Sequence, residues 1–409
     1  MSGGLGFDRA RLDRLDRHFA RYVEDGRLAG WQLAITRRGA TAHLSSCGFR
    51  DREAGSPVAD DTLWRVYSMT KPIASVAAMT LWEEGAFALT DPVSRWIPSF
   101  ADVRVYHRGS VDDVVTVPAI EPVRVWHLLT HTSGLTAGFL RTSVVDALYR
   151  RAGYDMGSPE GTTLASLCDD LARLPLLFQP GTAWGYGAST DVLGRLVEIW
   201  SGQSLDAAIA DRVTRPLGMA DTVWHADDAR ANRLAALYVP DPVTGLAVRA
   251  DAIGDRALSP PAVLSAGGGM LSTLPDYVRF TRMLAGGGEL DGVRVLAPRT
   301  LRLMTANHLA ADLRALSTGG FTNAVFDGVG FGLGFAVVVD PVKARTATSP
   351  GEHHWGGAAG TVFWVDPVEE LTVVFMTQLL HLAGSHLVPS EAHPIRARLR
   401  QLVYSALVA

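Results

Sequence analysis

The sequence predicts an α+β protein in which an antiparallel sheet is flanked by N- and C-terminal helices and interrupted by a large, mainly helical insertion. Three observations lead to this prediction. Helical periodicity opens the chain at 7–25 and closes it at 393–407, strand-like apolar runs lie inside these two helices, and helical segments fill the middle. Strands from both ends of a chain fit a single sheet. We therefore expect a sheet domain from 1–67 and 262–409, a helical domain from 68–261, and the functional site between them.

The N-terminal part begins with an amphipathic helix followed by a hairpin. The helix repeats four large apolar residues at helical spacing: Leu12, Leu15, Phe19 and Tyr22. Two apolar runs at 30–36 and 41–49 then predict strands, joined by a turn at 37–40. The segment 101–118 is mixed in character and fits a second, small hairpin.

The helical insertion and the last third of the chain follow in order. Segments 143–177 and 190–201 are predicted to be helical, and a glycine-rich turn at 264–273 precedes a helix at 275–285. Three apolar segments then predict an antiparallel meander, on which the closing helix packs: 331–340, 355–366 and 371–378.

Composition excludes several classes of function. The chain has 409 residues, enough for a large core, and a net charge of −4 without a basic run, so we expect no nucleic-acid partner. Cys47 and Cys168 are the only cysteines, which supports neither a disulfide framework nor a metal cluster. No signal-peptide pattern or membrane-spanning run is evident. We expect a cytoplasmic protein that does not contact a membrane.

The most informative stretch is 66–72, which reads Val-Tyr-Ser-Met-Thr-Lys-Pro ahead of an apolar helical segment. Pro72 locates the start of this helix, because proline is tolerated only where the N–H groups have no intrahelical partner. Ser68 then lies in or just before the first turn, where free N–H groups and a partial positive charge favour a developing oxyanion. Lys71, three residues later, lies on the same helix face as Ser68.

The scarcity of lysine makes Lys71 a candidate catalytic residue. Of the 38 basic residues, only Lys71 and Lys343 are lysines, and the others are arginines. A serine hydroxyl needs a proton acceptor to become a nucleophile, and a lysine amine can take this role whereas arginine cannot. An arginine-tolerant position in this chain is expected to be arginine. Lys71 is therefore predicted to exchange a proton with Ser68.

Two further stretches have more than one interpretation. His127 and His131 have the spacing of two zinc ligands on a helix, but the glutamate of a His-Glu-x-x-His motif and a third ligand are missing. They otherwise form a hydrogen-bonded turn under the site. Tyr186 lies between two glycines, in a turn that either exposes its hydroxyl or simply packs its ring.

Five motifs in this order resemble the serine β-lactamase and penicillin-binding-protein superfamily, whose signature is Ser-x-x-Lys. The motifs are 68–71, 127–135, 180–186, 216–219 (Pro-Leu-Gly-Met) and 268–273 (Gly-Gly-Met-Leu-Ser-Thr). The resemblance covers roughly residues 10 to 380 and is greatest to the class C β-lactamase-like esterases, called family VIII carboxylesterases. It implies a β-lactamase/transpeptidase-like fold.

The resemblance also implies roles for individual residues. Ser68 would be the acylated nucleophile, Lys71 its proton partner, and Tyr186 the second base, at the tyrosine of a Tyr-x-Asn motif. The family's Lys-Thr-Gly element, on a strand at the edge of the sheet, appears as Trp-Gly-Gly at 355–357. By analogy this strand would supply the second backbone N–H of the oxyanion hole, from Gly357 or Ala358.

Two positions depart from the pattern of β-lactamases and peptidases. Ala188 replaces the asparagine that binds the substrate's amide side chain, and Trp355 replaces the lysine that helps to bind a carboxylate. Trp355, Gly356 and Ala188 are therefore expected to line a substrate pocket suited to an acyl chain or an aromatic alcohol. A Gly-x-Ser-x-Gly motif is absent, which excludes an esterase of the α/β-hydrolase type.

These observations predict a serine carboxylesterase of EC 3.1.1 type that cleaves small to medium acyl esters through an acyl-enzyme on Ser68. We expect a small-molecule ester as its partner and no metal or organic cofactor, and make no prediction of the oligomeric state. An acyltransferase of the same fold, which passes the acyl group to an alcohol, is the nearest alternative. A β-lactamase or D-amino-acid peptidase and a non-catalytic, penicillin-binding-like sensor are the others.

Overall fold

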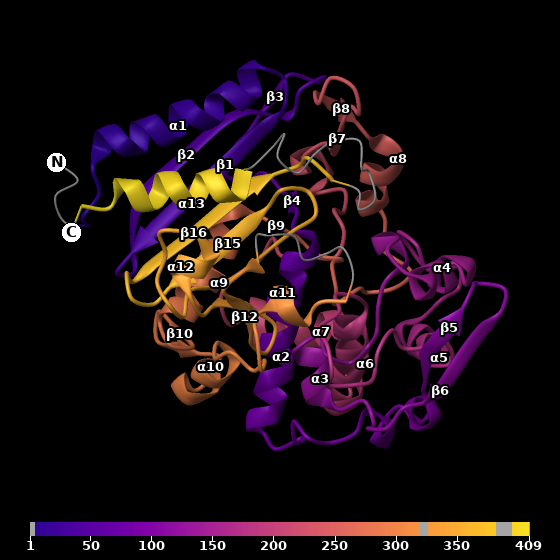
Figure 1. Cartoon of the computed structure of the whole chain (residues 1–409). Coiled ribbons are helices and arrows are strands. Elements are labelled where there is room, and N and C mark those ends of the chain that lie inside the picture. Colours follow the sequence, from indigo (N-terminus) through magenta and orange to yellow (C-terminus); the bar gives the residue numbers. More distant parts are fainter. Residues whose placement is uncertain (1–4, 319–325, 382–394, 409) are drawn as a thin grey trace.

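The computed structural model describes residues 5–318, 326–381 and 395–408, and is built around an eight-stranded antiparallel sheet (Figure 1). Its strands lie in the order β12-β13-β14-β15-β16-β1-β2-β3. Their bounds are Gly30–Arg37 for β1, Ala40–Asp51 for β2, Ser56–Pro57 for β3, Val329–Phe331 for β12, Ala336–Val338 for β13, His353–Gly356 for β14, Val362–Asp366 for β15 and Leu371–Thr377 for β16. Strand β1 pairs with β16, with Trp31 opposite Thr377, so strands from the first and last parts of the chain are neighbours in the sheet.

Helices cover both faces of this sheet. Helices α1 (Arg9–Glu24) and α13 (Ile395–Ala406) lie side by side on one face, and α9 (Leu274–Ala285) packs on the other (Figure 1). Successive residues of a strand point to opposite faces. Leu33 accordingly belongs to the buried cluster with α1 and α13, whereas Ala34 belongs to the cluster with α9. Burial on both faces explains why the central strands β1 and β16 are mostly apolar and do not alternate between polar and apolar residues.

The remaining helices connect or surround the sheet. They are α2 Thr70–Glu83, α3 Val125–Leu129, α4 Val144–Arg151, α5 Leu164–Arg173, α6 Ser189–Ser201, α7 Leu205–Ile209, α8 Asp251–Gly254, α10 Pro298–Met304, α11 Leu313–Leu316 and α12 Pro341–Ala344. Four two-stranded ribbons complete the described part of the chain: β4 Trp64–Arg65 with β9 Leu271–Ser272, β5 Arg104–Gly109 with β6 Val114–Pro118, β7 Tyr238–Pro240 with β8 Ala247–Arg249, and β10 Glu289–Leu290 with β11 Val293–Arg294.

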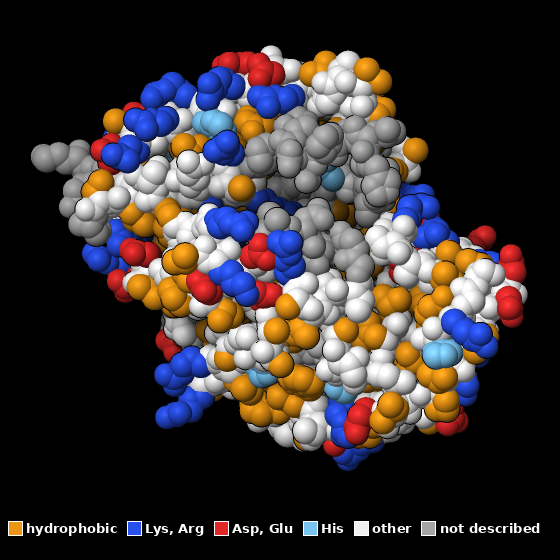
Figure 2. Space-filling view, in the orientation of Figure 1, with side chains coloured by type: hydrophobic (Ala, Val, Ile, Leu, Met, Phe, Trp, Pro, Cys, Tyr) orange, Lys and Arg blue, Asp and Glu red, His pale blue; other side chains and the backbone are white. Residues whose placement is uncertain are grey.

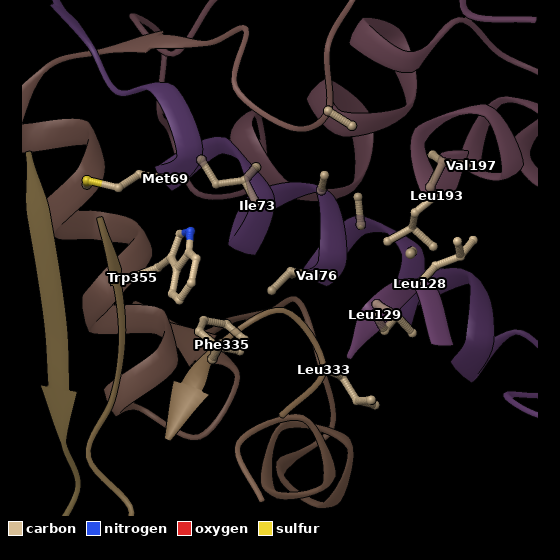
Figure 3. Packing of buried hydrophobic residues seen from close by; sticks show 14 of the residues in the cluster. Met69, Ile73, Val76, Leu128, Leu129, Leu193, Val197, Leu333, Phe335 and Trp355 are labelled. Carbon is tan, nitrogen blue, oxygen red and sulfur yellow. The ribbon is translucent and has the colours of Figure 1, made fainter. Parts of the chain in front are cut away.

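Helix α2 forms the centre of the larger hydrophobic cluster. Every residue from Thr70 to Leu81 is buried, as expected for a helix that is surrounded by other elements. Figure 3 shows Ile73 and Val76 of α2 in this cluster, together with residues of α3 and α6. The nucleophile predicted at the start of α2 therefore rests on a helix that is fixed by packing on all sides.

Most predicted elements are present, but three segments predicted to be continuous are not. The segment 331–340 contains the last residue of β12 and all of β13, which reverse direction around Gly334, at φ +94°. The segment 143–177 contains two helices, α4 and α5, because Gly153 and Gly161 adopt φ values of +92° and +76° between them. The segment 355–366 contains the end of β14 and all of β15, which reverse direction around Gly360, at φ +87°. The expected start of the closing helix at His393 lies outside the described residues.

The surface is charged and of mixed sign. Figure 2 shows basic side chains gathered along α1, which carries five arginines, with acidic side chains interspersed. Within the described ranges, no helix is both long enough and apolar enough to cross a bilayer.

Candidate active site

Ser68 lies in a single 3-10 turn, Tyr67–Met69, directly before α2. This is the placement that Pro72 predicts. The preceding residue, Tyr67, has a φ of +45°, a conformation that residues other than glycine seldom adopt. Ser68 is half-buried, and within the described ranges its side chain makes no hydrogen bond. A hydroxyl held at a strained turn and left without a partner is available to react with a bound molecule.

The glycine-rich loop 265–270 crosses the turn that carries Ser68. A Cβ atom on Gly268 would lie 3.8 Å from the Ser68 nitrogen, so the two backbones are close neighbours. Met270 fixes this approach: its N–H donates to Thr70 Oγ1 at 3.1 Å, and its carbonyl accepts from the Val66 N–H at 3.1 Å. The loop therefore forms one wall of the site.

Lys71 is buried between this loop and the ring of Tyr186. Its side chain is 5% exposed, and Nζ donates to the Gly267 carbonyl at 2.6 Å. Nζ also lies 4.5 Å from the centroid of the Tyr186 ring, within the range of a cation–π interaction. The structure thus brings together Ser68, Lys71 and Tyr186, which are 118 positions apart from first to last in the sequence.

The turn that carries Tyr186 is held by the segment 131–136. Three backbone bonds join them: Gly181 N–H to Thr132 at 2.8 Å, Gly185 N–H to His131 at 2.9 Å, and Ala188 N–H to Thr136 at 3.1 Å. A Cβ atom on Gly187 would lie 2.4 Å from the Thr136 backbone, so a glycine is required there. Of the two interpretations of the histidine-rich stretch, this geometry agrees with a hydrogen-bonded turn beside the site.

Both histidines of this stretch are neutral near pH 7. Burial and the positive charge of Lys71 hold the pKa of His131 well below its usual range, and its ring lies 5.1 Å from that of Tyr186. Burial, with Arg124 nearby, lowers the pKa of His127 to about 4, and His127 Nδ1 accepts the Arg124 N–H at 3.1 Å. The His131 ring therefore packs beside Tyr186 without placing a positive charge there.

Trp355 packs between Tyr186 and Phe331. Its ring centroid lies 5.5 Å from that of Tyr186 and 5.4 Å from that of Phe331, and the residue is 5% exposed. Figure 3 shows the indole in the buried cluster with Met69 and Ile73. Trp355 thus supports Tyr186 and presents little of its own surface. Ala188, the other departure from the β-lactamase pattern, is half-buried at the N-cap of α6.

The two glycines after Trp355 are closely packed, and a Cβ atom at either position would meet a neighbouring residue. A Cβ atom on Gly356 would lie 2.6 Å from Arg396 Cζ, and one on Gly357 would lie 2.4 Å from the Val66 carbonyl oxygen. The contact with Val66 brings the end of β14 against the turn that carries Ser68. Gly357 donates its own N–H to the Thr361 carbonyl at 2.9 Å.

The N–H of Ala358, in contrast, has no hydrogen-bond acceptor in the described part of the chain, and Ala358 is exposed. The prediction that this strand lies at the edge of the sheet was wrong, because β14 lies between β13 and β15. Among the residues that the structure describes, however, β13 pairs with β14 at His353 and His354 alone, so the part of β14 after His354 has no strand partner on that side. Because pairing between β13 and β14 stops at His354, the backbone after it is unpaired on that side, as the family resemblance had predicted for a strand at the edge of the sheet.

Arg396 of α13 is a residue of the site that the sequence did not indicate. Its Nη2 donates to the Gly357 carbonyl at 2.6 Å. Arg396 as a whole is exposed, but loss of water around its guanidinium, which lies against Gly356 and Gly357, and the charge of Arg400 lower its pKa to about 10, whereas nearby Tyr186 acts in the opposite direction. One arginine among several in the closing helix carries no local signal that it reaches a loop near residue 357.

The sequence and the fold of this chain are similar to those of known proteins. The Beta-lactamase family model matches residues 15–393. The chain is 38% identical to an uncharacterised protein of Mycobacterium tuberculosis, over 90% of each chain, and 33% identical to Esterase EstB of Burkholderia gladioli, over 96% of this chain and 95% of the esterase. Among solved structures it is similar to EstCE1, a hydrolase with promiscuous acyltransferase activity, at 27% identity and a TM-score of 0.79, over 97% and 99% of the two chains.

These matches cover nearly the whole chain, and the esterases among them support a serine hydrolase. The large antiparallel sheet between helices is the β-lactamase/transpeptidase-like fold. The chain therefore belongs to the β-lactamase family and, within it, is an esterase-like member similar to family VIII.

Proposed function

We propose that this protein is a serine carboxylesterase that cleaves esters of small to medium acyl chains through an acyl-enzyme on Ser68. The observation that carries the proposal is the position of Lys71, whose buried amine lies between the Gly267 carbonyl and the Tyr186 ring, one helical turn from the Ser68 hydroxyl. An amine that is buried beside a phenol and a serine suits proton transfer, which requires a group that can lose its own proton.

In the acylation step, Ser68 Oγ attacks the ester carbonyl carbon and its proton passes to the Lys71–Tyr186 pair. The carbonyl electrons move to the oxygen, where the N–H groups of Ser68 and Ala358 stabilise the negative charge. We assign the second N–H to Ala358 because that of Gly357 is used by Thr361. The carbon–oxygen bond to the alcohol then breaks, and the alcohol leaves with the proton held by the pair.

Deacylation repeats these steps with water in place of the serine. Water attacks the acyl carbonyl, its proton passes to the same pair, and Ser68 Oγ leaves and recovers a proton. The groups that serve acylation are sufficient for this step, and no residue beyond them is invoked. The substrate is a small-molecule ester, and the reaction as written needs neither a metal nor an organic cofactor.

Preference for esters over β-lactams follows from the two departures from the family pattern. With alanine at position 188 and a largely buried tryptophan at 355, the acylamino and carboxylate groups of a penicillin lack their usual partners. A buried polar group left without a partner costs about 1–3 kcal/mol. If two such losses add to about 2–6 kcal/mol, they amount to roughly 30-fold to 10⁴-fold in kcat/KM.

The test compares kcat/KM for p-nitrophenyl butyrate, nitrocefin and benzylpenicillin on one preparation of the enzyme. Slow opening of the reactive nitrocefin agrees with the proposal, because ring opening uses the same nucleophile. We expect the kcat/KM of the ester to exceed that of benzylpenicillin by about 30-fold or more, which corresponds to the loss of two partners at about 1 kcal/mol each. Penicillin turnover as fast as ester turnover would instead assign the chain to the β-lactamases.

Acyl transfer to an alcohol is the second candidate function. It is favoured by the similarity to EstCE1, a hydrolase with promiscuous acyltransferase activity, and by the similarity, at 26% identity, to Acyltransferase calJ of Penicillium decumbens. Both reactions share the acyl-enzyme and differ in the molecule that reaches it. Adding a competing alcohol to the ester assay distinguishes them: product ester that forms at the expense of free acid identifies transfer.

A further inference from the structure

Asp191 lies in the first turn of α6, five residues after Tyr186, and its carboxylate reaches into the loop that covers Ser68. Asp191 Oδ1 accepts the Gly267 N–H at 3.0 Å and the Ser265 hydroxyl at 2.7 Å. These partners are 76 and 74 positions away in the sequence. The carboxylate therefore joins two parts of the molecule, in addition to lying at the start of its own helix.

Both backbone polar groups of Gly267 make hydrogen bonds to side chains of the site. Asp191 accepts its N–H, and its carbonyl accepts from Lys71 Nζ at 2.6 Å. A Cβ atom on Gly267 would lie 2.8 Å from Asp191 Oδ2, so a side chain at this position would displace the carboxylate. A continuous chain of hydrogen bonds thus runs from the Asp191 carboxylate through one residue to the lysine amine.

These hydrogen bonds restrict the orientation of the Lys71 amine. A neutral amine has two N–H groups and one lone pair, and only the lone pair can take a proton from a hydroxyl. When one N–H is fixed on a rigid carbonyl, the lone pair is confined to fewer directions. A carbonyl that moved freely with its loop would not provide this restriction.

We propose that Asp191 is a positioning residue for the reaction: it fixes Gly267 so that the Gly267 carbonyl orients the Lys71 amine toward Ser68. The inference rests on the proposed function, because it assigns Lys71 the role of proton acceptor. Other hydrogen bonds shape the loop itself, since Gly268 and Gly269 donate to the Ser265 carbonyl at 3.0 and 2.8 Å. Asp191 anchors this preformed turn to α6, the helix that follows Tyr186.

The first test compares Asp191→Ala with the matched control Asp169→Ala. Asp169 is also half-buried and accepts a serine hydroxyl, that of Ser99, at 2.7 Å, but it does not touch the glycine-rich loop. We expect Asp191→Ala to slow the acylation burst with p-nitrophenyl butyrate by about 10-fold to 10²-fold, the cost of misplacing a catalytic group by about 1 Å. KM should stay unchanged, and Asp169→Ala should lose comparable thermal stability without slowing the burst.

Asp191→Asn is the conservative variant. Its amide oxygen can still accept the Gly267 N–H, so the burst rate should recover to within about threefold of wild type if position matters more than charge. A burst rate in Asp191→Ala equal to wild type overturns the inference. So does a loss of thermal stability as the only effect.

A double-mutant cycle tests whether Asp191 acts through Lys71. In the Lys71→Ala background, removing the Asp191 carboxylate should lower the remaining acylation rate less than about twofold, because coupled residues are not additive. An equal loss in both backgrounds would show that Asp191 does not act through Lys71 and would overturn the inference. If Ser68→Ala retained turnover, the proposed function itself would fail; normal activity of Asp191→Ala beside inactive Ser68→Ala would refute only the role of Asp191.

Discussion

Replacement of Lys71 by arginine separates proton transfer from positive charge. Arginine keeps a cation and several N–H donors, whereas it cannot release a proton in a protein. The proposed mechanism requires that release, so Lys71→Arg should be nearly as slow as Lys71→Met. General acid–base groups contribute about 10² to 10⁴ in rate, which corresponds to about 2.7 to 5.4 kcal/mol of activation free energy at 1.36 kcal/mol per tenfold.

The structure also gives the expected cost in stability. Methionine at position 71 leaves the Gly267 carbonyl without the 2.6 Å bond and removes the cation 4.5 Å from the Tyr186 ring. A buried acceptor left unpaired costs about 1–3 kcal/mol, and a cation–π contact is worth about 0.5–2 kcal/mol. Arginine retains the charge but adds atoms to a packed site. Both variants should therefore unfold at lower denaturant concentration than wild type while remaining folded in buffer.

The assay is the pre-steady-state burst of p-nitrophenol from p-nitrophenyl butyrate, measured by stopped flow. The chain provides its own control, since Lys343 is its second lysine and is exposed, where it donates to Asp312. Lys343→Arg should leave the burst unchanged. If Lys71→Arg kept its burst rate within tenfold of wild type, Lys71 would be an electrostatic or structural group, and the reasoning about proton transfer would be refuted.

Two further predictions concern Tyr186 and the carboxylate of Glu352. Tyr186→Phe should slow acylation by about 10² or more with little change in melting temperature, whereas an unchanged burst would leave this ring a packing role only. Glu352 is buried and accepts from Arg400 at 2.7 Å, so Glu352→Gln, which leaves Arg400 unpaired, should lower the free energy of unfolding by about 3–5 kcal/mol. Although burial opposes it, the charge of Arg400 and the contact with His354 hold the pKa of Glu352 below its usual range. This depressed pKa stabilises the fold at pH values above the ordinary glutamate pKa, and the stabilisation is lost as the pH falls through the folded-state pKa. The free energies of unfolding of wild type and variant, measured by urea titration, should therefore converge in acid. A difference that stays constant down to low pH would contradict the ion pair.

Local chemistry made the start of α2 predictable. A proline in the first turn and an apolar run after it place Ser68 and Lys71 without knowledge of the rest of the fold. The sheet was predictable for a similar reason, because burial on both faces leaves long apolar runs in β1 and β16. The role of Tyr186 came from resemblance alone, since a tyrosine between glycines is compatible with ordinary packing.

Other features of the site could not be predicted from the sequence because they depend on contacts between distant segments. Arg396 and Asp191 act on loops 39 and 76 positions away, and nothing in their immediate sequence indicates those partners. The reversal between β14 and β15 was not predicted for a different reason. The small residues at 356–360 continue an apolar run, and only the structure shows that Gly356 and Gly357 lie close to Arg396 and Val66. Periodicity reports which residues are buried, and it does not report which segments bury them.

The acyl-enzyme is the central claim of this account, and intact-mass spectrometry tests it most directly. The protein is quenched in acid during the burst with p-nitrophenyl butyrate, and the adduct is then located by peptide mapping. We predict a mass increase of one butyryl group, on the peptide that contains Ser68, and no increase in Ser68→Ala. Turnover without an adduct on Ser68, or an equal adduct in Ser68→Ala, would contradict the account.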